Sequence, residues 1–251
     1  MEEMLVSYPV DGHLATAQID ENSFWYQHRN EAILSLYQKY IKEEKTFFDI
    51  GGGNGIVAKY LQDAGKDVVL VEPYLEGAEM ALQRGVKNVM HKKLEALDSM
   101  ISNAGMFDVL EHLEDDKAVL KRLFIKQVTD SFIIITVPAS NTLWSDTDIN
   151  LGHFRRYSVA DLKLKMEAAG YTVLQRTYFF SLLWLPLLIF RVLPQRFGFK
   201  KDETKRRASE HVSSRSIKGR LVKWLLAWEI FFIKNGFSIP FGTSCIIIAK
   251  K

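Results

Sequence analysis

The apolar residues of this 251-residue chain fall into two patterns that succeed one another along the sequence. Short unbroken apolar runs, of the length of buried strands, alternate with longer stretches in which apolar residues recur at helical spacing. The runs that predict strands cover residues 46–50, 67–72, 88–90, 131–138, 171–178 and 243–250. The stretches that predict helices cover residues 31–41, 56–64, 74–84, 115–128 and 159–169. Such alternation is typical of an α/β fold, and the β-branched run 131–138 is expected at the centre of its sheet.

A glycine-rich turn at residues 51–55 joins the first predicted strand to the helix that follows it. Without side chains, such a turn lets a ligand approach the backbone closely, and the free N–H groups of the helix point towards that ligand. The spacing is G-x-G-x-G, because Ile56 stands where a dinucleotide fingerprint has its third glycine. No G-x-x-x-x-G-K-[ST] occurs here, so a P-loop is excluded. The stretch therefore predicts a nucleotide cradle of another kind.

The second predicted strand ends in an acid, Glu72, followed by Pro73. A carboxylate at the tip of this strand can accept hydrogen bonds from both ribose hydroxyls of an adenosine. It would repel a phosphorylated sugar. The turn and Glu72 together therefore favour an adenosine ligand with a free ribose.

Three segments carry a resemblance to a known family. The segments FDIGGGNG and VVLVEP resemble the first two motifs of the class I S-adenosylmethionine-dependent methyltransferases, and FDVLEHLEDD resembles the segment after that family's fourth strand. The resemblance implies a Rossmann-like, doubly wound, seven-stranded mixed sheet whose last strand is antiparallel. It also places a fourth strand within residues 99–106, although Asn103 and Gly105 are poor strand formers.

The resemblance implies S-adenosyl-L-methionine as the cofactor. The residues that match the motifs, and are thereby expected to bind it, are Asp49, Gly51, Gly52, Gly53, Asn54, Gly55, Glu72, Pro73 and Phe107. Where the family has an acid for the adenine amino group, this chain has His91-Lys92-Lys93-Leu94-Glu95, so the backbone near Leu94 or the side chain of Glu95 is expected there instead. Family members often begin with an aromatic segment containing an arginine that closes over the cofactor. Arg29 is therefore expected to clamp the methionine carboxylate.

Histidines supply the candidates for proton transfer. Glu111 and His112 follow the fourth strand, at the sheet edge where open α/β sheets bind ligands. His112 could accept a proton from a hydroxyl or amine as it is methylated, or it could be a hydrogen-bonded structural residue that caps the loop. His153, and behind it Tyr157, are the other candidates. A base is optional, because the sulfonium of the cofactor is already a strong electrophile and the reaction needs mainly alignment and exclusion of water.

The loop after residues 131–138 is expected to form the substrate side of the cleft. Its phrases LWSDTD and GHFRRYS resemble a bacterial subgroup of the family, and Trp144, Arg155 and Arg156 are the candidate substrate contacts. The two arginines suggest an anionic substrate. Alternatively, one of them ties the loop down through a salt bridge with Asp146 or Asp148.

Composition narrows the alternatives. With 47% hydrophobic residues the chain can bury one large core. The single cysteine, Cys245, is expected to pack in a reducing compartment, and the acidic start of the chain predicts no secretory signal, so a cytoplasmic location is expected. The sequence requires no metal, since the six histidines show no ligand spacing such as H-E-x-x-H.

Residues 179–241 form an insertion between the last two predicted strands. It begins with an apolar run at 178–190 that is too short to span a bilayer, and residues 191–223 hold eleven cationic against three acidic side chains, a local charge of 11 − 3 = +8 in a chain of net charge +3. Trp224, Leu225, Trp228 and Phe231 share one helical face. This pattern fits an interfacial helix on an anionic membrane, a lid over an apolar pocket or a dimer interface. Nucleic acid is disfavoured, because no recognition signature accompanies the cations.

We expect a helical cap at 1–45, a methyltransferase core at 46–178 and 242–251, and the insertion at 179–241. The expected function is methyl transfer to a small molecule that is amphiphilic or anionic, with peripheral membrane contact through the insertion. Two alternatives are an NAD-dependent oxidoreductase, which the glycine spacing disfavours, and a non-catalytic membrane-docked scaffold that binds the cofactor. The sequence does not indicate the oligomeric state.

Overall fold

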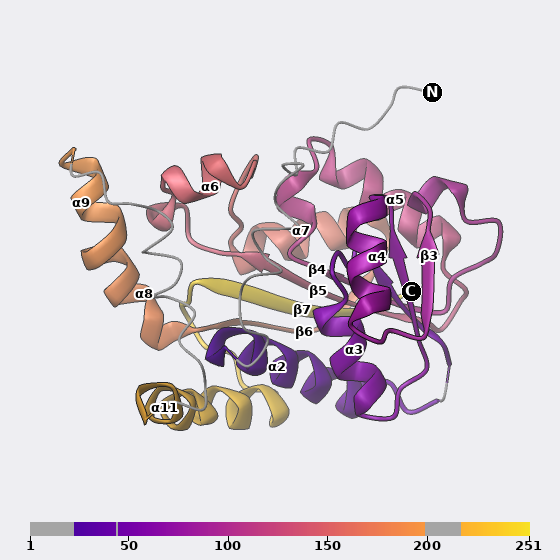
Figure 1. Ribbon diagram of the computed structural model, residues 1–251, viewed down its shortest axis with the longest axis horizontal. Coiled ribbons are helices and arrows are strands. Elements are labelled where there is room, and N and C mark those ends of the chain that lie inside the picture. The colour runs from indigo at the N-terminus through magenta and orange to yellow at the C-terminus, as the bar shows by residue number, and fades with distance from the viewer. Residues whose placement is uncertain (1–22, 44, 199–216) are drawn as a thin grey trace.

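A computed structural model describes residues 23–43, 45–198 and 217–251. These residues form one seven-stranded sheet with the strand order β3-β2-β1-β4-β5-β7-β6 (Figure 1). The strands are β1 Phe47–Ile50, β2 Val68–Glu72, β3 Asn88–His91, β4 Asn103–Phe107, β5 Phe132–Pro138, β6 Thr172–Phe179 and β7 Ser244–Lys250. β7 runs antiparallel to both of its neighbours, while β1 to β5 pair in parallel. The expected fold class is confirmed.

The centre of the sheet is β4 rather than β5. The expectation for residues 131–138 was wrong by one place: β3, β2 and β1 lie on the far side of β4, and only β7 and β6 lie beyond β5, so β5 is an interior strand next to the centre. β4 contains the two poor strand formers, and both have a structural reason. The side chain of Asn103 accepts a hydrogen bond from the Phe132 N–H at 3.0 Å. A Cβ at Gly105 would overlap the ring of Phe107, so the glycine makes room for that ring.

Helices cover both faces of the sheet. α5 (Asp116–Lys126) and α7 (Val159–Ala169) bury their apolar side chains in one core, and α2 (Phe24–Tyr40), α3 (Ile56–Asp63) and α11 (Ile217–Lys234) bury theirs in the core on the opposite face. The described residues also form the helices α4 Leu75–Gln83, α6 Asp146–Asn150, α8 Ser181–Leu187 and α9 Leu193–Arg196. They further form the short 3₁₀ helices η1 Leu94–Ala96, η2 Leu110–His112 and η3 Asn141–Leu143, and the π-helix η4 Leu188–Val192. The doubly wound arrangement follows from this distribution.

The predicted cap and the predicted insertion are in contact. α11 lies beside α2 beneath the sheet (Figure 1), and a buried hydrogen bond of 2.9 Å joins His28 of α2 to Glu229 of α11. The same carboxylate accepts the backbone N–H groups of Phe180 and Ser181, at the start of α8. Burial would raise the pKa of Glu229, but His28 and Ser181 outweigh burial and lower it. The domain boundaries stay a prediction, since residues 1–22 of the cap and 199–216 of the insertion lie outside the described residues.

No helix in the described part of the chain combines the length and apolar character needed to cross a bilayer.

Candidate functional site

The glycine turn has backbone angles that only glycine adopts readily. Gly51, Gly53 and Gly55 have φ values of 71°, 53° and 78°, in the left-handed region. A Cβ on Gly52 would lie 2.8 Å from both Asp49 Oδ2 and Leu70 Cδ1. The turn therefore has no room for side chains at its base, and a ligand can approach its backbone closely. The N–H groups of Gly51, Gly53 and Gly55 are themselves bonded to Val71, Glu72 and Gly52, so the predicted contact of the turn's N–H groups with a ligand stays a prediction.

Glu72 faces this turn from the end of β2. Its Oε2 accepts the Gly53 N–H at 2.8 Å, and its Oε1 accepts the Tyr74 N–H at 2.9 Å. Burial raises the pKa of Glu72, and the two backbone donors only partly offset this rise. Each carboxylate oxygen has a second lone pair, so the group can still accept hydroxyl hydrogen bonds from a ribose placed over the turn.

Asp49 lies beneath the turn and is 1% exposed. Neither carboxylate oxygen has a hydrogen bond of ordinary geometry among the described residues, and the nearby Ala58 N–H lowers the pKa of Asp49 less than burial raises it. Burial raises the pKa of Asp49 to about 7, although the charge of Arg29 opposes this. A buried carboxylate without donors is costly, and a positively charged ligand over the turn would lower that cost.

Arg29 reaches the site from α2. Its Nη1 donates to Asp108 Oδ2, and its guanidinium lies 5.3 Å from the centre of the Tyr26 ring. Asp108 directly follows β4 with φ of 58°, and its Oδ1 accepts from Thr136 at 3.1 Å. Asp108 was missed by the sequence reasoning, although it stands inside the segment that carries the family resemblance. The predicted clamp is thus held at the cleft edge by an acid that a ligand carboxylate would have to replace or share.

The remaining predicted cofactor residues lie at the same sheet edge, with different exposure. Asn54 is buried, and its carbonyl accepts from Arg84 at 2.8 Å. The Pro73 carbonyl is bonded to His91 at 3.1 Å. The ring of Phe107 stacks on Phe47 in the core, so only its backbone is at the edge. These contacts leave the predicted roles of these residues untested.

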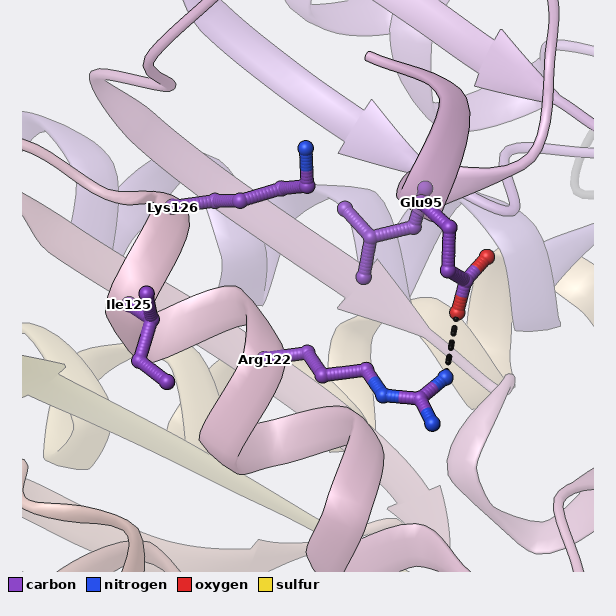
Figure 2. A pocket seen from close by; sticks show the side chains of 5 residues that line it. Glu95, Arg122, Ile125 and Lys126 are labelled. Carbon is purple, nitrogen blue, oxygen red and sulfur yellow. Dashed lines mark hydrogen bonds and ion pairs between the residues drawn. The ribbon is translucent and has the colours of Figure 1, made fainter. Parts of the chain in front are cut away.

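Leu94 and Glu95, the candidates near the adenine, line a hollow of about 230 Å³ between η1 and α5 (Figure 2). Leu94 is buried, and Glu95 is bonded to Arg122 at 2.9 Å. The walls are the side chains of Arg122, Ile125 and Lys126. Because all five lining residues come from η1 and the C-terminal half of α5, we interpret the hollow as a gap between these two elements, and the predicted adenine contacts of Leu94 and Glu95 stay predictions.

On the acceptor side, Asp148 organises the loop that follows β5. Its Oδ1 accepts from His153 Nδ1 at 2.9 Å and from Arg156 Nε at 2.7 Å, and its Oδ2 accepts the Ser145 N–H at 3.0 Å. Burial would raise the pKa of Asp148, but the His153 hydrogen bond and the Arg156 charge lower it to about 2. The salt-bridge alternative for the two arginines is therefore confirmed for Arg156.

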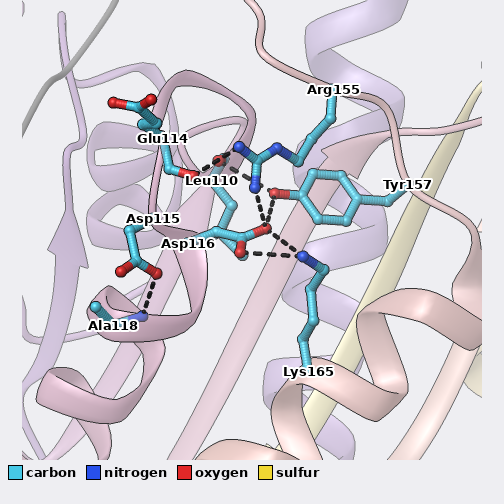
Figure 3. Close-up of polar contacts among 8 residues, drawn as sticks. All are labelled: Leu110, Glu114, Asp115, Asp116, Ala118, Arg155, Tyr157 and Lys165. Carbon is cyan, nitrogen blue, oxygen red and sulfur yellow. Dashed lines mark hydrogen bonds and ion pairs between the residues drawn. The ribbon is translucent and has the colours of Figure 1, made fainter.

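Asp116, at the start of α5, is a second organising acid (Figure 3). It accepts the Tyr157 hydroxyl at 2.7 Å and Lys165 Nζ at 2.8 Å, and it forms an ion pair with Arg155 at 3.2 Å. Tyr157 is 1% exposed, and burial together with Asp116 raises the pKa of its hydroxyl. Arg155 also donates to the Glu114 carbonyl. These contacts are those of a structural tie between α5 and the loop, so they weaken the substrate prediction for Arg155 and the catalytic one for Tyr157. Trp144, the third substrate candidate, is half-buried directly after η3.

His112 and His153 lie together at the edge, with ring centres 4.8 Å apart. Burial and the neighbouring His153 lower the pKa of His112 to about 3, so at neutral pH the ring is an uncharged and weak base. Glu111 beside it is 1% exposed, and burial with the charge of Asp108 raises its pKa well above the usual range. The structure brings these two candidate bases together, which the sequence did not predict, and the lowered pKa makes His112 poorly suited to accept a proton.

Comparison with known proteins identifies the fold and the family. A family model described as a methyltransferase domain matches residues 24–176, more than half of the chain. A SAM-dependent methyltransferase from Archaeoglobus fulgidus has a TM-score of 0.56 and 21% identity, with 88% of this chain and 92% of that one covered. A protein from Thermotoga maritima titled as a possible histamine N-methyltransferase has a TM-score of 0.55 and 17% identity, with 90% of this chain and 92% of that one covered. An S-adenosylmethionine-dependent methyltransferase from Clostridium acetobutylicum has a TM-score of 0.56 and 11% identity, with 96% of each chain covered. A search of curated proteins found no match.

The seven-stranded sheet with its antiparallel seventh strand is the fold of these solved methyltransferases, and the family model over residues 24–176 identifies the chain as a class I S-adenosylmethionine-dependent methyltransferase. The chain belongs to the methyltransferase family, and it is an enzyme of that class. Its cofactor is S-adenosylmethionine. The site fits this cofactor, because the turn at Gly52 leaves no room for a Cβ, Glu72 faces the turn and the buried Asp49 would be stabilised by a cation. The match gives no support to an NAD-dependent oxidoreductase.

Proposed function

We propose that the protein methylates an amphiphilic small molecule at the surface of an anionic membrane, in the cytoplasm. The observation that carries this proposal is an exposed apolar surface on the insertion, next to the acceptor side of the cleft. The arginines that suggested an anionic acceptor are engaged with Asp116 and Asp148, which weakens that alternative. The single cysteine, Cys245, is buried in β7, in keeping with a reducing compartment.

The exposed apolar surface consists of large exposed side chains on α8, η4, α9 and α11 and at the residue directly after α9. The helices α8, α9 and α11 lie towards one end of the molecule (Figure 1). On α11, Trp224 is 65% and Trp228 63% exposed, while the opposite side of the helix is buried against α2. The other exposed members are Leu182, Leu185, Ile189, Phe190, Leu193, Leu221, Leu225, Phe231 and Phe232, together with Phe197 directly after α9. A soluble monomer rarely leaves so many large apolar groups in water, so this surface favours an apolar partner.

Contacts join this surface to the acceptor loop. Trp184 of α8 donates its indole N–H to Ser140 Oγ at 3.1 Å, and Arg196 of α9 donates to the Thr142 carbonyl at 3.2 Å. Both acceptors follow β5, at the carboxyl edge of the sheet. An acceptor with an apolar tail could therefore rest its tail against the insertion while its polar head enters the cleft.

The charge of the insertion favours a membrane over another apolar partner. Residues 191–223 carry a local charge of +8, and tryptophans flanked by cations are typical of helices that lie at an anionic bilayer surface. Described cations at this surface include Arg220 and Lys223, both on exposed positions of α11. A second copy of the chain would bring like charges together, which opposes a dimer through this surface.

The residues of the cleft would act by binding and alignment. S-adenosylmethionine supplies an electrophilic methyl group when bound. Glu72 and the turn would hold the adenosine, and Arg29 would hold the methionine carboxylate at the other end of the cofactor. Asp49, beneath the turn, would favour a positive charge above it. His112 and His153 would orient the reacting hydroxyl or amine of the acceptor, and the apolar insertion would exclude water.

The test combines cofactor binding, vesicle binding and turnover. Calorimetry with S-adenosylhomocysteine should show binding. The protein should co-sediment with anionic vesicles, and a Trp224→Ser/Trp228→Ser variant should bind them about tenfold more weakly. The wild type should methylate amphiphilic acceptors carried in those vesicles. Leu164→Ser is the matched control, since Leu164 is 65% exposed on α7, away from the insertion. Equal turnover of water-soluble acceptors with no vesicle binding would refute the membrane part. Cofactor and vesicle binding without any turnover would favour the scaffold.

A further inference from the structure

Two loops place three potential metal ligands next to one another. Glu111 and His112 belong to η2, directly after β4, and His153 follows α6 in the loop after β5. Each offers one ligand atom, and these atoms all lie within 4.8 Å of one another. This is the group of potential ligands found in the described residues, and it lies at the carboxyl edge of the sheet beside the cleft.

The backbone holds the two loops together at this point. The Phe154 N–H donates to the Glu111 carbonyl at 2.8 Å, which fixes His153 beside Glu111. His112 is hydrogen-bonded with the backbone of Gly152, one residue before His153. The three ligands therefore come from rigidly paired segments, and little chain entropy has to be lost when an ion joins them.

His153 has the support that metal-binding histidines usually have. Its Nδ1 is bonded to Asp148, which leaves Nε2 as the nitrogen available to an ion. Asp148 is itself held by Arg156 and by the Ser145 N–H. A histidine that donates one N–H to a buried carboxylate has a fixed tautomer and ring orientation and a more basic second nitrogen.

The surroundings of Glu111 give an independent reason to expect a cation here. Its side chain is almost fully buried, and Oε2 has no hydrogen-bond partner in the part of the chain that the structure describes. A buried carboxylate oxygen without a donor is costly unless a cation or a donor arrives. A metal ion between Glu111 and the two imidazoles would satisfy it.

We propose that Glu111, His112 and His153 form a binding site for one divalent transition-metal ion beside the methyl-transfer cleft. Two imidazoles and one carboxylate suit Zn²⁺, Fe²⁺ or Mn²⁺ and leave coordination positions open. Two metal–ligand bonds of about 2.1 Å span at most about 4.2 Å, so the widest pair of ligand atoms closes by roughly 0.6 Å on binding. An acceptor hydroxyl in an open position would be polarised, and its pKa lowered, by the ion.

The experiment measures ion binding alone, without cofactor or acceptor, so its failure leaves the proposed methyl transfer untouched. The full chain is freed of metal with a chelator and titrated with ZnCl₂ by calorimetry, and with CoCl₂ by visible absorption. We expect one ion per chain. Replacing either imidazole, as His112→Gln or His153→Asn, should weaken binding by about 100-fold or more. The asparagine amide keeps a donor for Asp148 but lacks the second ring nitrogen.

His91→Asn is the matched control, because His91 is an exposed histidine at the end of β3, and its removal should leave ion binding unchanged. Circular dichroism and S-adenosylhomocysteine binding report whether the variants fold. If they do not fold, the NMR spectrum of the wild type is recorded with Co²⁺. Broadening of the ring signals of His112 and His153 is then the expected result. Equal binding by the folded variants, broadening of the His91 ring signal alone, or no ion bound below about 1 mM would overturn the proposal.

Discussion

The acids on the two sides of the cleft have opposite surroundings. On the cofactor side, Asp49 and Glu72 are buried with backbone donors or no donor at all, and burial raises the pKa of both. On the acceptor side, Asp116 and Asp148 are equally buried, but lysine, arginine and histidine partners outweigh burial and lower their pKa values. Burial alone therefore does not decide the state of these carboxylates; the presence of a protein cation does.

This difference indicates which side still needs a ligand. The acceptor-side acids are held by protein cations that lower their pKa values, whereas burial outweighs the charges of Arg29 near Asp49 and of His91 near Glu72, and the pKa values of these cofactor-side acids are raised. A positively charged cofactor would complete the second group. Glu111 is the exception on the acceptor side, since its pKa is raised like those of the cofactor side, and it is there that we propose a metal ion.

The largest effect is expected at the glycine turn and Glu72. Glu72→Ala removes a charged acceptor of hydroxyl hydrogen bonds and should weaken S-adenosylhomocysteine binding by about 2–3 kcal/mol, roughly 30- to 150-fold, in calorimetry. Gly53→Arg should weaken it at least as much, because the side chain would enter the cradle from a left-handed backbone position. Glu72→Gln, which keeps one acceptor oxygen, is the graded control. Unchanged affinity in both Glu72 variants would place the ribose elsewhere.

A smaller effect is expected from pH. The pKa of Asp49 is raised to about 7, so the carboxylate is mostly protonated below this value and mostly ionised above it. Only the ionised form attracts a cation, and S-adenosylmethionine affinity should therefore rise by up to about tenfold, or 1.4 kcal/mol, between about pH 6 and pH 8. Asp49→Asn should flatten this dependence. A profile that stays the same in Asp49→Asn would assign it to another group.

The smallest effect is expected on the acceptor side, from Tyr157→Phe. The change removes one hydrogen bond to Asp116, which keeps Lys165 and Arg155, so denaturant unfolding should show a loss of about 1 kcal/mol. Cofactor binding and methyl transfer should change little. A fall in kcat of about 100-fold with normal stability would instead restore Tyr157 as a catalytic residue.

Local patterns predicted the strands and helices of the fold well, whereas the roles of the cofactor-side residues stay predictions. Strand and helix periodicity, the glycine spacing and the acid at the end of β2 are all patterns of a few consecutive residues. The backbone conformation that each pattern favours is decided by those same residues. The structure shows the strands within one to four residues of the predicted ends. The predicted position of β5 in the sheet was wrong by one place, because the order of strands in a sheet depends on contacts between distant segments.

The acceptor side depends on distant pairs, and the sequence indicated them poorly. The bond from Arg156 to Asp148 was one of two open alternatives, but the ties of Tyr157 and Arg155 to Asp116 were not foreseen. The group of Glu111, His112 and His153 escaped a search for ligand spacing because its members lie on separate loops. Asp108 was the exception, since its place after β4 and inside a family-like segment offered a signal.

Glu229 has a mechanical consequence. One carboxylate grips His28 on α2 and the first residues of α8, and the next residue of α2 is Arg29, whose guanidinium reaches Asp108 at the cleft. α11, which bears the exposed tryptophans, is therefore connected through His28 to Arg29 at the cofactor side of the cleft. A partner that shifts α11 would therefore shift α2 as well, and with it the arginine proposed to hold the methionine carboxylate of the cofactor.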